Sequence, residues 1–188
     1  MASTATPVFE REVSASSLSK SSSDLPAAYD SRTKGCITTV KNQGDADNCW
    51  SFTFSAISES ALVKSGLADK SIDLSESHTV WFTQRSGLGT NSDDTTYGDG
   101  LKNSQPYEEG STLYSAAVNA LSGKGVELET YAPFYSDKSN FDKMSFDDEA
   151  QRYISEYRLK NILFFSADDK DDIKKAVMEY GAINKDYY

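Results

Sequence analysis

The sequence predicts an α+β fold in one domain. Helical patterns cover residues 49–65 and 111–125, a further helix is expected to start within 73–82, and another helical pattern covers residues 168–181. A strand pattern lies over residues 154–167, and shorter extended patterns lie over residues 35–42 and 126–134. A chain of 188 residues can bury one substantial core and is slightly short for two domains. We therefore expect these helices and strands to share one core.

The strongest helical pattern covers Cys49 to Ser65. Its apolar residues fall near one stripe, and Gly66 is a suitable residue to end the helix. Asn48 can serve as its N-cap, because asparagine is favoured at that position. The segment is apolar over more than one face, which predicts a helix buried in the middle of the domain. The members of the stripe are Trp50, Phe54, Ile57, Ala61 and Leu62.

The remaining elements follow from caps, stops and composition. A second helix is expected to start within residues 73–82, with Ser75 or Asp73 as its cap. The tract 86–109 is polar and long enough to be a functional loop. A helix with a glycine stop is expected over 111–125, an acidic loop over 137–149, and a capped helix over 168–181 that ends at Gly181.

The first 24 residues are rich in serine and differ in composition from the rest. Such a segment buries too little apolar surface to order itself, so we expect a flexible leader or linker over residues 1–24. The folded domain is then expected over residues 25–188, starting near Leu25 and Pro26.

Charge and hydropathy exclude several classes of partner. The net charge of −10 argues against binding nucleic acid or an anionic membrane surface, since both require a basic surface. No apolar run approaches the roughly 20 residues that a transmembrane helix needs, so no membrane insertion is expected. Residues 1–13 contain no stretch like the apolar core of a signal peptide. The chain is therefore either cytosolic or a form without its export signal, and we favour the second.

The chain contains two cysteines, Cys36 and Cys49, and one histidine, His78. This number is too small for a disulfide framework, and the spacing does not match a metal site. We expect no metal and no cofactor. A free cysteine is most often a small buried apolar residue, and this alternative stays open for both thiols.

Cys49 nevertheless lies where a thiol can act as a nucleophile. At the first turn of a helix, backbone N–H groups and the helix dipole favour a thiolate. The same N–H groups can stabilise an oxyanion on a bound carbonyl, and the side-chain amide of Gln43 could donate a second hydrogen bond to it. Gln43 followed by Cys49 at a turn-to-helix junction therefore fits acyl transfer by a thiolate.

The residues around Cys49 resemble the papain-like cysteine peptidases. The stretch YDSRTKGCITTVKNQGDADNCWSFTFSAISESALVKSG contains the V-K-N-Q-G and C-W-S-F runs of that family at the family's separation. The resemblance continues more faintly through DLSESHTV, YEEGSTLYSAAVNALSGKGVELETYAPF and DIKKAVMEYGAI, so it spans roughly residues 25 to 183.

This resemblance implies a papain-like fold and a peptidase. The fold would have a helical half with the long central helix from Cys49 and an incomplete antiparallel β half, with Cys49 at the floor of a cleft between them. The activity would be hydrolysis of peptides or proteins through an acyl-enzyme. Cys49 matches the nucleophile and Gln43 the oxyanion-hole donor. Trp50 matches the aromatic residue after the nucleophile, with a core aromatic as the alternative. Gly110 matches the glycine that pairs with the substrate backbone, with an ordinary turn glycine as the alternative.

Two features of the motif depart from the family. Ala46 replaces a cysteine that usually forms a disulfide, a loss that also occurs in some bacterial members. Asp45 and Asp47 stand where small residues are usual. Their carboxylates could oppose ionisation of the thiol, point to solvent, or shape the groove entrance at Asp47 and favour basic substrate residues.

The third departure is the catalytic histidine. In the family it lies roughly 130–150 residues beyond the cysteine, a window that opens near Glu179 here, and an asparagine follows it. His78 matches the second helix instead, so we expect it to be structural or exposed. Without an imidazole partner the 188 residues should be a poor peptidase on their own.

Two explanations compete for the missing histidine. We favour a fragment whose missing C-terminal segment or second chain supplies histidine and asparagine. The alternative is a non-catalytic papain-like module that binds peptides or proteins. A transglutaminase-like acyltransferase is a further alternative, although none of its later motifs is present. The resemblance, the serine-rich leader and the acidic, tyrosine-rich composition suggest a secreted or cell-surface protein.

Overall fold

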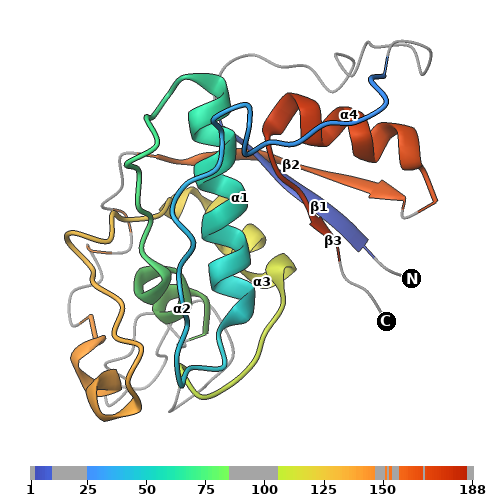
Figure 1. Ribbon diagram of the computed structural model, residues 1–188. Helices are drawn as coiled ribbons and strands as arrows, with labels where there is room; N and C mark the ends of the chain where they lie inside the picture. Colours follow the sequence, from blue (N-terminus) through green and yellow to red (C-terminus); the bar gives the residue numbers. More distant parts are fainter. Residues whose placement is uncertain are drawn as a thin grey trace. The chain divides into compact units, whose positions relative to one another are not determined.

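A computed structural model describes residues 3–9, 25–84, 106–146, 151, 153, 157–166 and 168–185. The chain consists of two compact units. Unit 1 consists of Met1–Thr39, Ala56–Ile72 and Leu159–Tyr188, and unit 2 consists of Val40–Ser55 and Asp73–Arg158. The elements run in the order β1 (Ser3–Phe9), α1 (Cys49–Ser65), α2 (Glu76–Gln84), α3 (Leu113–Asn119), η3 (Ala120–Lys124), η4 (Lys138–Lys143), β2 (Leu159–Ser166), α4 (Lys170–Tyr180) and β3 (Asn184–Lys185) (Figure 1).

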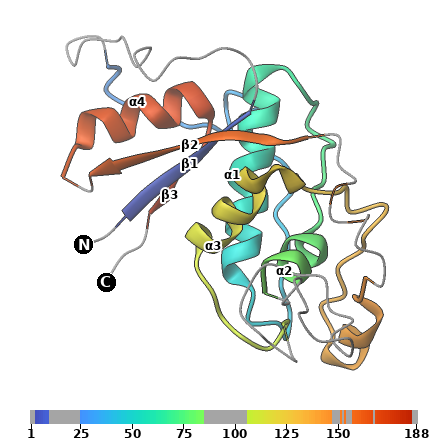
Figure 2. The same ribbon diagram turned by 180° about the vertical axis from the view of Figure 1, so that it is seen from behind.

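Unit 1 contains a three-stranded antiparallel sheet in the order β2-β1-β3 (Figure 2). β1 pairs with β2 along its length, so that Pro7 lies opposite Ile162. The pairing with β3 is limited to Thr4 and Ala5. At Pro7, β1 therefore has a paired neighbour on one side only, which suits a residue that cannot donate a backbone hydrogen bond. Helices together with this antiparallel sheet confirm the expected α+β class.

The strand β1 corrects the expectation of a flexible leader over residues 1–24. Ser3–Phe9 is paired backbone, flanked by two strands that take up its N–H and C=O groups. Its sequence STATPVF contains threonine, valine and phenylalanine, which favour strands once a partner strand is present. Pairing with distant residues outweighs the local composition. Residues 10–24, with the serine run, lie outside the described residues, and for them flexibility stays a prediction.

Helix α4 packs on the sheet of unit 1, and both ribbon views show it beside β2 (Figures 1 and 2). Ala176 and Tyr180 on one side of the helix contact Leu163 and Phe165 of β2. Leu163 and Phe165 alternate with residues that point to the other face of the strand, as strand geometry requires. The helix ends as predicted at Gly181, whose φ of 90° favours glycine.

Helix α1 confirms the predicted range at both ends. Gly66 has a φ of 72°, and the next N–H, from Leu67, bonds back to the carbonyl of Leu62 at 3.0 Å. This closes the helix with a glycine-terminated C-cap. Most of the helix is buried, as its apolar pattern predicted; the buried residues are Trp50, Ser51, Phe54, Ser55, Ile57, Ser58, Glu59, Ser60, Ala61 and Leu62.

In unit 2, α2 is capped by Ser75, one of the two predicted caps. The hydroxyl of Ser75 accepts the backbone N–H of His78 at 3.0 Å. Every residue of α2 is buried, and the helix packs against α3. The rings of Phe82 and Phe146 lie 5.3 Å apart in the same core.

Four other predictions are corrected by the structure or lie mostly outside the described residues. The helix expected over 111–125 breaks into α3 and the short π-helix η3, because Gly123 adopts a φ of 89° inside it. The loop expected over 137–149 contains the 3₁₀ helix η4. The extended segment 35–42 forms no strand. Most of the predicted loop 86–109 lies outside the described residues. Among the described helices, none has the length and apolarity to cross a membrane.

Candidate active site

Cys49 is the exposed thiol of the chain and the first residue of α1. The next residue, Trp50, is buried, so the helix start is anchored while the sulfur side chain reaches solvent. A helix of 17 residues presents unpaired N–H groups and a positive dipole at this end. Cys36 is different, because it is buried and its sulfur contacts the Ser31 carbonyl at 3.3 Å. The structure thus leaves one cysteine accessible to a substrate, Cys49.

Gln43 lies in the loop that leads into α1, and its side chain is half-buried. The amide nitrogen donates to the carbonyl of Ala46 at 2.6 Å. An amide nitrogen carries two hydrogens, so this bond orients the side chain and leaves one N–H for another acceptor. The geometry is compatible with a donor to an oxyanion, although part of the group is used within the loop.

The loop 43–48 is held on one side by the turn that precedes η4. The backbone N–H of Asp45 donates to the Ser136 carbonyl at 2.8 Å, and the N–H of Lys138 donates to the Asp45 carboxylate at 3.2 Å. Gly44 has a φ of 59°, and a Cβ at this position would overlap the carbonyl oxygen of Ser136. Both the conformation and the close approach therefore require glycine at position 44.

The same loop is held on its other side by the segment 106–110. The backbone N–H of Asp47 donates to the carbonyl of Tyr107 at 3.0 Å. The side-chain nitrogen of Asn48 donates to the carbonyls of Pro106 and Glu109 at 3.2 and 3.5 Å. Asn48 is therefore fully buried and tied to a distant segment rather than capping α1 with its side chain. This corrects the predicted side-chain N-cap.

The acidic residues beside Cys49 share a lysine. Lys138 forms a salt bridge with Glu108, and this hydrogen bond raises the pKa of Lys138. The charges of Asp45 and Asp47 raise it further. The rim of the loop thus has more negative than positive groups, with one lysine among them.

Trp50 and Gly110, the other two predicted site residues, differ in exposure. Trp50 is 4% exposed, and its indole N–H has no partner among the described residues. This burial favours the core alternative for Trp50. Gly110 is exposed, its φ is ordinary, and a Cβ there would meet no atom of the described residues within 4 Å.

His78 is a core residue, as predicted from its place in the second helix. It is 1% exposed, and its ring lies 4.6 Å from that of Phe82 and 5.8 Å from that of Phe146. Its Nε2 donates to the Gln151 carbonyl at 3.0 Å, and its Nδ1 has no partner among the described residues. Burial lowers the pKa of His78 to about 4. A neutral, enclosed imidazole of this kind is not a general base for Cys49.

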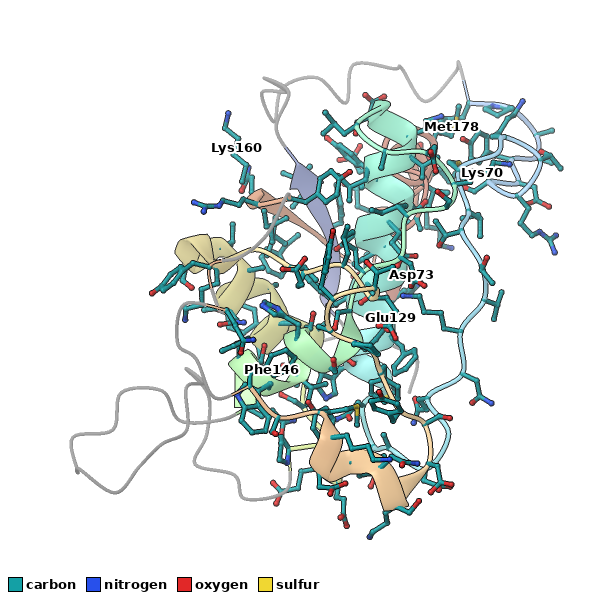
Figure 3. All side chains as sticks on the ribbon, turned by 90° about the vertical axis from the view of Figure 1, so that its left-hand side faces the viewer. Lys70, Asp73, Glu129, Phe146, Lys160 and Met178 are labelled. Carbon is teal, nitrogen blue, oxygen red and sulfur yellow. The ribbon has the colours of Figure 1, made fainter. Side chains whose placement is uncertain are left out.

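A partly buried charge cluster was not predicted. The Lys41 ammonium binds Asp73 at 2.6 Å and Glu76 at 2.9 Å. The backbone N–H of Glu129 donates to the Asp73 carbonyl at 2.8 Å, and Figure 3 shows Asp73 and Glu129 side by side. Burial, followed by the charges of Glu76 and Asp73, raises the pKa of Glu129 to about 7. Lys41 belongs to the V-K-N-Q-G run, but its partners are too distant in sequence for the run to indicate them.

Within the described ranges, no group of three or more His, Cys, Asp or Glu side chains is arranged to hold a metal ion. Around Cys49, the arrangement offers a thiol, backbone N–H groups and a side-chain amide.

Comparisons with known proteins agree on one family. The family model described as papain family cysteine protease matches residues 25–186. A stretch of 57 residues is 44% identical to procathepsin L of Mus musculus and covers 30% of this chain and 16% of that protein.

Two solved structures share the fold. The cysteine protease and lectin-like domains of Cwp84, a surface layer associated protein of Clostridium difficile, align with 92% of this chain at 21% identity and a TM-score of 0.55. Digestive procathepsin L 3 of Tenebrio molitor aligns with 85% of it at 22% identity and a TM-score of 0.52. The aligned regions are 31% and 44% of those two chains. The chain therefore spans less than half of these relatives, and the likeness shows a papain-like fold.

Proposed function

Because the chain belongs to the papain family of cysteine proteases, we propose that it is a cysteine-type peptidase with Cys49 as its nucleophile. The observation that carries this proposal is the placement of Cys49, exposed at the first position of a long buried helix. A thiolate is stabilised there by the helix N-terminus, and a bound carbonyl can reach both the sulfur and the backbone N–H groups.

The proposed reaction is hydrolysis of a peptide bond in two steps. The Cys49 thiolate attacks the carbonyl carbon, and the oxyanion accepts hydrogen bonds from the Cys49 backbone N–H and the remaining N–H of Gln43. The C–N bond then breaks, the amine leaves with a proton from an imidazolium, and a thioester remains on Cys49. Water, deprotonated by the same imidazole, hydrolyses the thioester and releases the acid.

The imidazole of this mechanism is not His78, because that ring is buried in the aromatic core. We infer that the catalytic histidine and its asparagine come from residues other than the 188 described by this sequence. On that basis the chain by itself does not hydrolyse peptides at an enzymatic rate. The burial of His78 also favours a second candidate, a non-catalytic module that binds peptides or proteins through the same loops.

The proposed substrate is an extended peptide that lies along the backbone of Gly110. The open space over Gly110 supports this position. Asp47 lies at the rim of the same region with Asp45 and Glu108, near the ammonium of Lys138. Trp50 is assigned a supporting role, because its burial keeps the start of α1 in place.

We also propose that the protein acts outside the cytoplasm, in a secreted form or at the cell surface. The support is the likeness to Cwp84, which is a surface layer associated protein.

Labelling of Cys49 by a peptidyl epoxide tests the proposal, with intact mass and peptide mapping as the readout. We expect labelling of Cys49 at a rate at least about tenfold above that of an amino acid epoxide without a peptide portion, because the peptide positions the electrophile. Cys49→Ala abolishes the label and Gln43→Ala slows it. Cys36→Ala is the matched control and leaves the rate unchanged, because Cys36 is buried.

The result that overturns the peptidase is equal labelling by the two epoxides, even after a histidine-bearing segment from the same gene is supplied. Retained binding of peptides under those conditions then identifies the chain as the binding module. Cross-linking of amine donors to glutamine peptides without cleavage identifies an acyltransferase instead.

A further inference from the structure

Asn48 directly precedes the nucleophile and forms hydrogen bonds with two different segments of the chain. Its backbone carbonyl accepts the N–H groups of Ser51 and Phe52 at 2.9 and 3.4 Å, so it belongs to the start of α1. Its side-chain nitrogen donates to the carbonyls of Pro106 and Glu109. One residue therefore connects the nucleophile helix to the segment that leads to Gly110.

The side chain of Asn48 is used as a donor and not as a cap. Its Oδ1 is buried and accepts no hydrogen bond in the described part of the chain, whereas both donated bonds end on backbone carbonyls. Serine and aspartate cap helices about as well as asparagine but lack a nitrogen with two hydrogens. Donation to two carbonyls therefore explains why residue 48 is an asparagine better than capping of α1 does.

The segment that Asn48 holds is itself fixed. The hydroxyl of Tyr107 donates to the carbonyl of Met144 at 2.6 Å. The side-chain nitrogen of Gln84, at the end of α2, donates to the Glu109 carbonyl at 3.1 Å. Ala46, in the loop before the nucleophile, is buried, and an alanine side chain cannot form a disulfide to another segment. Hydrogen bonds from Asn48 and from the Asp47 backbone carry this connection.

From these contacts we infer that Asn48 is a positioning residue, which sets the distance between the sulfur of Cys49 and a peptide lying along Gly110. This inference rests on the proposed peptidase function. Asn48 touches neither the sulfur nor the substrate and acts through the placement of the loop. A displacement of about 1 Å at a reacting atom can slow a reaction by about 100-fold.

The experiment compares two electrophiles at Cys49 in the full 188-residue chain. The labelling rate with a peptidyl epoxide depends on the distance between the sulfur and a peptide lying along Gly110. The labelling rate with iodoacetamide depends on the reactivity of the sulfur alone. Asn48→Asp keeps the size of the side chain and removes its donors, and Asn48→Ala removes the group without burying a charge. Asn119→Ala is the matched control: Asn119 is a buried asparagine of α3 whose oxygen accepts from Lys124.

Both Asn48 variants should slow the peptidyl epoxide by about 10- to 100-fold, and Asn48→Ala should change the iodoacetamide rate by less than about twofold. Asn119→Ala should leave the ratio of the two rates unchanged. The inference is overturned if Asn48→Ala keeps the wild-type ratio of the two rates, whether both rates are unchanged or both fall in proportion. A purely structural role predicts the proportional fall.

Amide hydrogen exchange separates this inference from the proposed function. If wild-type Cys49 shows no preference for the peptidyl epoxide, the peptidase proposal fails while Asn48 is still testable. The Asp47 N–H, bonded to the Tyr107 carbonyl, should then exchange about tenfold faster in Asn48→Ala than in the wild type. An unchanged exchange rate contradicts the role of Asn48 in holding the loop.

Discussion

The carboxylate of Glu129 accepts a hydrogen bond from the backbone N–H of Phe134 at 2.6 Å. The second carboxylate oxygen is buried and has no hydrogen-bond partner among the described residues. The ring of Phe134 packs edge-on against Phe52 of α1, with 5.0 Å between the ring centres. A titratable group therefore holds a segment that supports the helix bearing Cys49.

Glu129→Gln should stabilise the protein at alkaline pH. Burial raises the pKa of Glu129 from 4.5 to about 7 in the folded chain. The unfolded chain thus releases the proton first, and stability contributed by Glu129 is lost as pH rises from 4.5 to about 7. Glutamine keeps the acceptor for Phe134 and does not ionise. Its gain at pH 8 should be on the order of 1–2 kcal/mol, allowing for partial exposure.

Urea unfolding at pH 4 and pH 8 measures this effect. The gain should vanish near pH 4, where Glu129 is protonated in both states. Glu127→Gln is a suitable control, since Glu127 is a buried neighbour that bonds the adjacent Leu128 N–H. An equal gain at both pH values would show that ionisation of Glu129 is not the cause.

His78→Leu should reduce the decrease in unfolding free energy that occurs at acidic pH. Burial lowers the pKa of His78 from 6.5 to about 4, so the folded chain resists protonation. The stability that the neutral ring contributes is present above pH 6.5 and is lost as pH falls toward 4, by up to about 3 kcal/mol. At pH 7 the variant should be less stable by about 1–2 kcal/mol, because the bond to Gln151 is removed.

The same variant tests the role of His78 in chemistry. Labelling of Cys49 by the peptidyl epoxide at pH 7 should stay within about twofold of the wild-type rate, because a buried ring cannot activate the thiol. A decrease in the labelling rate of 100-fold or more, on the order expected for a general base, would identify His78 as the catalytic imidazole.

Gly44→Ala should be more harmful than Gly66→Ala, although both glycines have positive φ. A Cβ at Gly44 would overlap the Ser136 carbonyl, whereas a Cβ at Gly66 would meet nothing within 4 Å. We expect a cost of about 1 kcal/mol at Gly66 from backbone strain and roughly 3 kcal/mol at Gly44 from strain and overlap. Gly44→Ala should also slow labelling of Cys49 by the peptidyl epoxide. Equal costs in thermal unfolding would rule out the close approach to Ser136.

Asp47→Asn should weaken a preference for cationic substrates. Asp47 lies at the rim beside Cys49, and its backbone bond to Tyr107 is kept in the variant. At low salt the rate ratio between lysine- and alanine-containing peptidyl epoxides should fall by about two- to fivefold, and high salt should reduce the difference. Asp142→Asn, at an exposed residue of η4, should leave the ratio unchanged. A salt-independent change would exclude an electrostatic origin.

Local signals in the sequence were sufficient for some elements. The range of α1 was predictable because its apolar pattern, its start and Gly66 are contiguous in the chain. The cap of α2 at Ser75 and the stop of α4 at Gly181 follow the same logic. In each case the residues that form the boundary are neighbours in sequence.

The features that the sequence did not predict depend on contacts between residues that are distant in the chain. β1 is a strand because residues 159–166 and 184–185 lie on either side of it. Asn48 looked like a cap, and only the positions of Pro106 and Glu109 show that its side chain is used elsewhere. Cys49 and Gln43 stay predictions made from the motif, whereas the turn at Ser136 that supports their loop carries no recognisable signal.

The central place of β1 affects how the protein is made. The strand is synthesised before the residues that pair with it, and these emerge from the ribosome only after more than a hundred others have been added. Such long-range pairing is slow to form and leaves a nascent strand exposed in the meantime. Unit 1 therefore depends on protection of its amino-terminal strand until translation has passed residue 185, whereas the segments of unit 2 become available earlier.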